Sequence, residues 1–69
     1  METIGDRIRD MRMQKGLSQH KLAEISGVSR SYLIEIEENK YNLSAVVLCK
    51  LAKSLEVTPN DLIPSFMYR

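Results

Sequence analysis

Residues 19–36 read QHKLAEISGVSRSYLIEI, and the order of small, turn-forming and apolar residues in this stretch predicts two short crossed helices. Ala23, Gly27 and Val28 lie four, eight and nine residues after Gln19. Two helices that cross steeply after a turn of about three or four residues need a small side chain at their contact, which Ala23 supplies. The tight turn needs a positive φ, which glycine adopts without a steric penalty.

The residues after this turn complete the pattern. Val28 fills the angle between the two helices, while Leu33 and Ile36 lie three apart and anchor the second helix to the core. Each feature alone is a weak signal, because small and apolar residues are common. Together, at these offsets in one window of 18 residues, they are specific for a helix-turn-helix motif.

Capping residues on both sides of the motif predict an all-α fold of five helices. A Ser or Thr that can accept a backbone N–H precedes each apolar stretch, and Thr3 has Asp6 three residues later, as in a capping box. Gly16, Gly27 and Asn39 stand where a left-handed residue ends a helix. We expect one domain over residues 1–69, with helices at about 4–15, 18–26, 29–37, 44–55 and 59–63 and a tail at 64–69.

Helical periodicity predicts which side chains form the core. Ile4, Ile8 and Met11 form one stripe, and Leu22, Ala23 and Ile25 are expected on the inner face of the second helix. Cys49 lies beside the apolar stripe of the fourth helix and is expected to be partly buried. In the last helix, Leu62 and Ile63 are the expected core residues.

Composition argues against several classes of function. The chain has 69 residues, 43% of them apolar, which is enough for one compact core but not for a deep substrate pocket as well. It shows no nucleophile–base pair, metal-ligand cluster or glycine-rich phosphate loop, and His20 has no partner ligands at metal spacing. We therefore expect no enzyme activity, metal, cofactor or small-molecule substrate.

The same survey bears on location and on charge. The single cysteine, Cys49, cannot form an internal disulfide, which favours a reducing compartment. No signal-peptide pattern or membrane-length apolar run is present, so we expect a cytoplasmic protein without a membrane partner. The formal net charge of +1 argues neither for nor against nucleic acid.

Residues 4–63 resemble the phage-repressor type of helix-turn-helix domain, the Cro and lambda-repressor-like family that is often called XRE. The resemblance rests on IGDRIRDMRMQKGLSQHKLAEISGVSRSYL at residues 4–33 and LCKLAKSLEVTPNDLI at residues 48–63. Within the first, LSQ-x-x-LA-x-x-x-GVS is a specific family signature. The resemblance implies a compact five-helix domain whose second and third helices form a DNA-binding motif.

The resemblance also implies roles for individual residues. Gln19 would contact backbone phosphate and brace the recognition helix, and Arg12 and Glu37 would form a buried structural salt bridge. Base edges would be read by Ser29, Arg30, Ser31 and Glu35, and phosphate would be met by Lys40 and Asn42. At Ile34 and Glu35 the chain departs from the family, whose members commonly carry polar or basic residues there.

The chemistry of these side chains suits reading of the major groove. Arg30 can donate two hydrogen bonds to guanine, and Glu35 can accept one from the amino group of cytosine. Ser31 can donate or accept, and Tyr32 can meet phosphate through its hydroxyl. Ser18, like Ser29, stands at a helix N-terminus, where free N–H groups favour phosphate.

These features predict a sequence-specific transcriptional regulator, a repressor or autoregulator that binds a double-stranded DNA operator. Apolar residues on the fourth helix and in the tail predict a homodimer reading an inverted repeat, with an interface that includes Leu43, Val46, Phe66 and Met67. The alternative is a protein-interaction module, such as an antitoxin or an adaptor, that uses the same fold.

Overall fold

The computed structural model describes residues 2–40 and 43–64, and within these ranges it contains four α-helices and one 3-10 helix but no strand. The elements are α1 (Ile4–Gln14), α2 (Gln19–Ser26), α3 (Arg30–Glu37), α4 (Ala45–Ser54) and η1 (Pro59–Leu62). The predicted all-α fold is therefore confirmed, and each helix boundary lies within one residue or so of the predicted one.

The predicted helix starts are confirmed by hydrogen bonds at each cap. Thr3 Oγ1 accepts from the Asp6 N–H at 3.1 Å, while the Asp6 carboxylate accepts from the Thr3 N–H at 3.2 Å. The hydrogen bond with the Thr3 side chain, together with that of the Thr3 backbone, holds the pKa of Asp6 below its usual range. The hydroxyls of Ser18, Ser29 and Ser44 each accept from the backbone N–H three residues on.

Left-handed residues follow all four α-helices: Gly16, Gly27 and Asn39, which the sequence predicts, and Glu56 after α4, which it does not. Gly16 and Gly27 have φ of 71° and 76°, and Asn39 has φ of 62°. Gly27 is the turn residue between α2 and α3, so its backbone sets the direction in which α3 leaves α2. Asn and Gly tolerate this region of φ better than other residues, which explains their presence here.

The last element is a 3-10 helix rather than the predicted α-helix. The Thr58 N–H and hydroxyl both donate to the Asp61 carboxylate, at 2.9 and 3.0 Å, so the predicted start at residue 58 is correct. Pro64 follows so closely that only one turn can form, and single turns are commonly 3-10. Leu62 is fully buried, whereas Ile63 is only partly buried.

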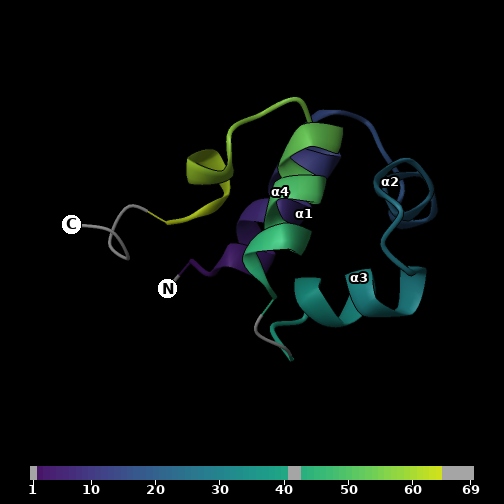
Figure 1. Cartoon of the computed structure of the whole chain (residues 1–69), viewed down its shortest axis with the longest axis horizontal. Coiled ribbons are helices and arrows are strands. Elements are labelled where there is room, and N and C mark those ends of the chain that lie inside the picture. Colours follow the sequence, from purple (N-terminus) through teal and green to yellow (C-terminus); the bar gives the residue numbers. More distant parts are fainter. Residues whose placement is uncertain (1, 41–42, 65–69) are drawn as a thin grey trace.

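The core lies where all five elements meet (Figure 1). Helix α1 packs against α3 and η1, α4 packs against α2 and η1, and α2 packs against α3. In Figure 1, α2 and α3 lie on one side of the α1–α4 pair and η1 lies on the other. The fully buried side chains come from every element: Ile8, Leu22, Leu33, Ile36, Leu51, Leu55 and Leu62.

Besides Ile63, which is not among the described side chains that pack against the core cluster, two of the predicted core positions are wrong. Ile25 is 46% exposed, and Cys49 is exposed rather than partly buried. The reason is the same in both cases. At ~100° per residue, each side chain points ~110° from the middle of the buried stripe of its helix, which is Leu22 and Ala23 in α2 and Leu51 and Ala52 in α4.

The helices in the described part of the chain are short, and none of them combines the length and apolar character that a membrane crossing requires.

Gly5 is buried where the first turn of α1 meets the end of α3. A Cβ at this position would run into the Ile36 carbonyl oxygen and the Asn39 side chain. Helix propensity alone favours Gly5→Ala by ~1 kcal/mol. We nevertheless expect the substitution to lower the free energy of unfolding by about 2 kcal/mol, because α1 and α3 must separate to admit a methyl group. Urea denaturation followed by circular dichroism measures the change.

Gly16→Ala is the matched control. A Cβ at Gly16 meets no atom within 4 Å, so only its φ of +71° opposes the change, at a cost of ~1 kcal/mol. A Gly5→Ala protein more stable than the wild type would show that α1 and α3 do not approach as closely as described.

Candidate nucleic-acid interface

Helix α3 has one face in the core and one face in solvent. Leu33, Ile36 and Glu37 are buried, whereas Arg30 and Ser31 are exposed in its first turn. Glu35 is partly exposed one turn later, and Ser29 is the exposed N-cap. The structure therefore brings the four residues predicted to read bases to the outward side of one helix.

The N-terminus of α2 offers a second polar position beside the motif. Ser18 is an exposed N-cap whose hydroxyl accepts from the Lys21 N–H at 3.0 Å. Gln19 follows as the first residue of α2 and is partly buried. N–H groups in the first turn of a helix have no partner within the helix and favour anions such as phosphate.

An ion pair between Arg12 of α1 and Glu37 of α3 holds the motif on its core-facing side. Arg12 donates from Nε to Glu37 Oε2 at 2.8 Å and from Nη2 to Glu37 Oε1 at 3.0 Å. The third nitrogen, Nη1, donates to the Leu17 carbonyl oxygen at 2.9 Å. The side chains of Arg12 and Glu37 are only 13% and 3% exposed. This is the pair that the resemblance implied, and it is fully hydrogen-bonded.

Gln19 joins the same network. Its Nε2 donates to Glu37 Oε1 at 3.2 Å, so the start of α2 is tied to the last residue of α3. A side-chain amide carries two N–H donors. One N–H of Gln19 is therefore used by Glu37, and among the described residues the second has no hydrogen-bond partner. This arrangement fits both roles predicted for Gln19.

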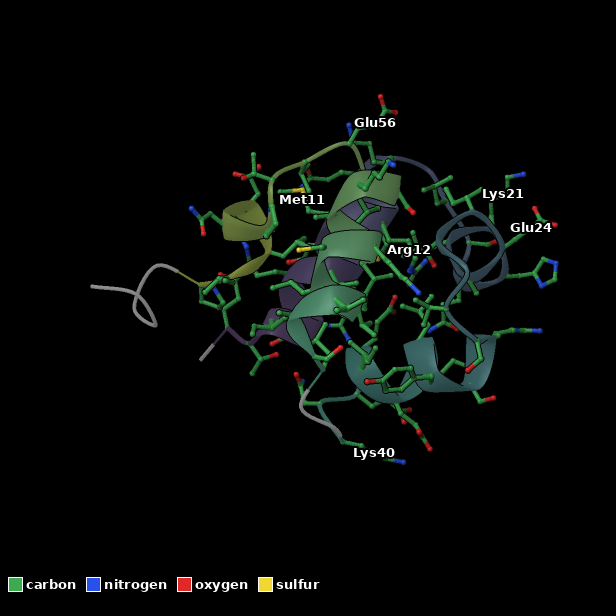
Figure 2. All side chains as sticks on the ribbon, in the orientation of Figure 1. Met11, Arg12, Lys21, Glu24, Lys40 and Glu56 are labelled. Atoms are coloured by element: carbon green, nitrogen blue, oxygen red, sulfur yellow. The ribbon has the colours of Figure 1, made fainter. Side chains whose placement is uncertain are left out.

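Figure 2 shows how differently the charged side chains lie. Arg12 lies in the interior among the helices, whereas Lys21, Glu24 and Lys40 extend outward. Lys21 and Glu24 form an exposed pair within α2, with Nζ and Oε1 3.1 Å apart. The hydrogen bond from Lys21 holds the pKa of Glu24 below its usual value.

The remaining predicted DNA-backbone residues occupy different surroundings. Tyr32 is partly buried and packs against the core. Lys40 is exposed after α3, and its Nζ lies 3.2 Å from the Glu38 carboxylate. Sequence reasoning did not single out Glu38, which sits at the C-cap of α3. Asn42 lies outside the described residues, and the contacts of all three with phosphate stay predictions.

The residues predicted for a dimer interface differ in how far they are exposed. Leu43 is partly buried against the core, and its contribution to an interface stays a prediction. Val46 is 65% exposed on α4. An open groove of about 410 Å³ runs along the same face, lined by Ala45, Val46, Cys49, Lys50 and Lys53. Phe66 and Met67 lie outside the described residues.

Within residues 2–40 and 43–64, no group of three or more His, Cys, Asp and Glu side chains is placed to hold a metal ion. The exposed polar side chains of the motif are instead donors and acceptors suited to phosphate and base edges.

A comparison with protein families gives a match over residues 8–62, to the family described as helix-turn-helix. The chain belongs to this family. The matched range includes both helices of the motif, the Arg12–Glu37 pair and the core residues of α4 and η1. The resemblance recognised from the sequence is therefore confirmed.

Curated relatives of this helix-turn-helix chain are transcription regulators rather than enzymes. The immunity repressor protein of Bacillus phage phi105 is 38% identical over 61 residues, which cover 88% of this chain and 42% of the repressor. The transcriptional regulator SinR of Bacillus subtilis is 43% identical over 61 residues, covering 87% of this chain and 55% of SinR. The chain thus spans about half the length of these two relatives.

Solved structures share the fold. SinR in complex with DNA superimposes with a TM-score of 0.84 at 43% identity, covering 87% of this chain and 97% of that chain. The restriction-modification controller protein C.AhdI from Aeromonas hydrophila gives a TM-score of 0.85 at 43% identity, covering 87% of this chain and 91% of that chain. The helix-turn-helix architecture of α2 and α3 is therefore that of DNA-binding regulators.

Removing the charge of Glu37 tests the network. In Glu37→Gln the Arg12 guanidinium stays largely buried but loses its counter-ion, and we expect the free energy of unfolding to fall by about 3 kcal/mol. Chemical denaturation measures this change. Glu24→Gln is the matched control, because it removes the same charge from an exposed pair and should leave stability unchanged within error. Equal effects of the two substitutions would contradict a structural role for the buried pair.

Proposed function

We propose that this chain is a sequence-specific regulator of transcription that inserts α3 into the major groove of a double-stranded DNA operator. The observation that carries the proposal is the division of α3, with a buried ion-paired side and an outward side bearing Arg30, Ser31 and Glu35. The DNA complex of SinR supports it, because 43% of the aligned residues are identical. Repression of its own promoter is the expected mode of action.

The exposed side chains of α3 suit base reading. The major groove of B-DNA is about 12 Å wide and admits one α-helix. Arg30 would donate two hydrogen bonds to guanine, and Glu35 would accept one from the amino group of cytosine. Ser31 could either donate a hydrogen bond to a base or accept one from it. Ser29, the N-cap of α3, would also face a base edge, and Ser18, the N-cap of α2, would lie beside a phosphate.

Contacts with the DNA backbone would set the register of this helix. Gln19 would donate its second N–H to a phosphate while the first holds Glu37. Lys40 would exchange Glu38 for a phosphate, which is possible because the pair is exposed and weak. Tyr32 and Asn42 complete the predicted set of phosphate contacts.

The functional unit would be a homodimer in the cytoplasm. Val46 is 65% exposed on α4, and the adjoining groove gives a second copy an apolar surface to cover. Leu43, Phe66 and Met67 are expected to contribute to the same interface. A twofold dimer would present two α3 helices about one DNA turn apart and so read an inverted repeat.

Fluorescence anisotropy with the duplex upstream of the chain's own gene tests DNA reading. Against a scrambled duplex, we expect a preference of about 10³-fold or more. Arg30→Ala should weaken binding to the specific duplex by about 10- to 100-fold, because one two-bond contact with guanine is lost. Lys53→Ala is the control, since it removes the same charge from the far end of α4.

The control should keep its specific binding. If Arg30→Ala and Lys53→Ala behave alike, α3 is not the reading helix. If no duplex from the promoter region or from a random pool binds at low salt, the protein-interaction module becomes the better description of the chain.

The proposed interface makes a separate prediction. Val46→Glu would place two like charges across a twofold axis, so we expect it to shift the protein from dimer to monomer in sedimentation velocity. The helix itself should tolerate the change, because an acidic residue in the first turn of α4 suits the helix dipole. Met13→Glu is the control, because Met13 is 63% exposed but lies on α1. A wild-type monomer at high micromolar concentration would contradict the dimer.

A further inference from the structure

Ile34 is an apolar residue on the outward side of α3 with no evident use in the core. It is partly exposed, and among the described residues it is not one of the partly buried apolar side chains that pack against the core cluster. Tyr32, two positions earlier on the same helix, does pack there. Ile34 therefore lies outside the core-facing side of α3, as Arg30 and Ser31 do.

Helix geometry places Ile34 among the residues predicted to read bases. Each residue turns an α-helix by ~100°, so Ile34 points ~40° from the direction of Arg30, one turn farther along. Ser31 points ~100° from Arg30, so the direction of Ile34 lies between those of the two exposed residues. A groove contacted by both Arg30 and Ser31 is then also contacted by Ile34.

Neither folding nor helix formation accounts for this isoleucine. Its side chain does not complete the core, and β-branched residues are slightly poorer helix formers than Lys, Gln or Glu. At a partly exposed helix position outside the core, a polar residue would cost little stability. The isoleucine therefore points to an apolar partner outside the protein.

We infer that Ile34 is a specificity-determining residue that contacts the 5-methyl group of a thymine in the operator. This inference rests on the proposed function, because it needs α3 in the major groove. The thymine methyl is the apolar group that a base pair presents in that groove, and aliphatic side chains recognise it by contact. Discrimination comes from apolar burial rather than from a hydrogen bond.

The position of the thymine follows from the same geometry. Arg30 and Ile34 are separated by a rise of ~6 Å along α3. Successive bases on one DNA strand are ~3.4 Å apart. The thymine read by Ile34 therefore lies within about two base pairs of the guanine read by Arg30 in each half-site.

Replacing thymine with deoxyuridine tests this contact, because the exchange removes only the 5-methyl group. The operator is first selected from a random duplex pool with the wild-type protein. Each thymine of the selected duplex is then replaced singly, and binding is measured by anisotropy. We expect one position per half-site at which the replacement weakens wild-type binding by about 4-fold, the effect of losing one buried methyl group.

Ile34→Ala and Ile25→Ala complete the experiment. Both remove the same atoms from an isoleucine outside the core, but Ile25 lies on α2, beside Lys50 and Lys53 of α4. Ile34→Ala should bind thymine and deoxyuridine duplexes equally, while Ile25→Ala should keep the 4-fold difference. Thermal melting of both variants should match the wild type, since neither side chain is in the core.

Each outcome decides the matter. Methyl dependence that survives in Ile34→Ala would overturn the role of Ile34 while leaving DNA binding intact. So would specific wild-type binding that is indifferent to every thymine methyl. Failure of the selection to enrich any duplex would instead overturn the proposed function, and the reading of thymine with it.

Discussion

The buried ion pair between Arg12 and Glu37 is the constraint on which the geometry of the motif depends. Glu37 is the last residue of α3, and its carboxylate accepts three hydrogen bonds, two from Arg12 and one from Gln19. Arg12 in turn binds the Leu17 carbonyl oxygen between α1 and α2. A buried pair adds little net stability, because desolvation offsets the attraction. Its directional bonds do, however, fix α1, α2 and α3 in one arrangement.

Because the Arg12–Glu37 pair holds α3 from its core-facing side, the solvent-facing side of α3 makes no contact that the fold requires. Leu33, Ile36 and Glu37 hold the helix to the body of the domain, so Arg30, Ser31 and Ile34 are not needed for the fold. Gly5 serves the same end, because it lets α1 approach the Ile36 carbonyl oxygen closely. A rigidly held helix with an uncommitted face can change the bases that it reads without a loss of stability.

What the sequence predicted well depends on local rules. The caps at Thr3, Ser18, Ser29 and Ser44 act over three residues, so they could be recognised from spacing alone. The exposure of Ile25 and Cys49 could not, because it depends on where neighbouring helices lie. Arg12 and Glu37 are 25 residues apart, and only the family resemblance paired them. The close approach at Gly5 had no signal in a single sequence, since its partner is a backbone atom of a distant helix.

The near-neutral charge bears on how such a small domain would bind DNA. Non-specific affinity comes mostly from neutralised phosphates, and a chain with a net charge of +1 supplies little of it. The face of α3 includes Glu35 and Glu38, so attraction to the backbone is weaker still. Specific affinity must then come from base contacts, and one short helix offers few. A second copy makes the next set of contacts intramolecular and multiplies them without any new chemistry. For this reason, a homodimer formed through the apolar face of α4 would strengthen specific binding, because it would present the outward face of α3 twice to one operator.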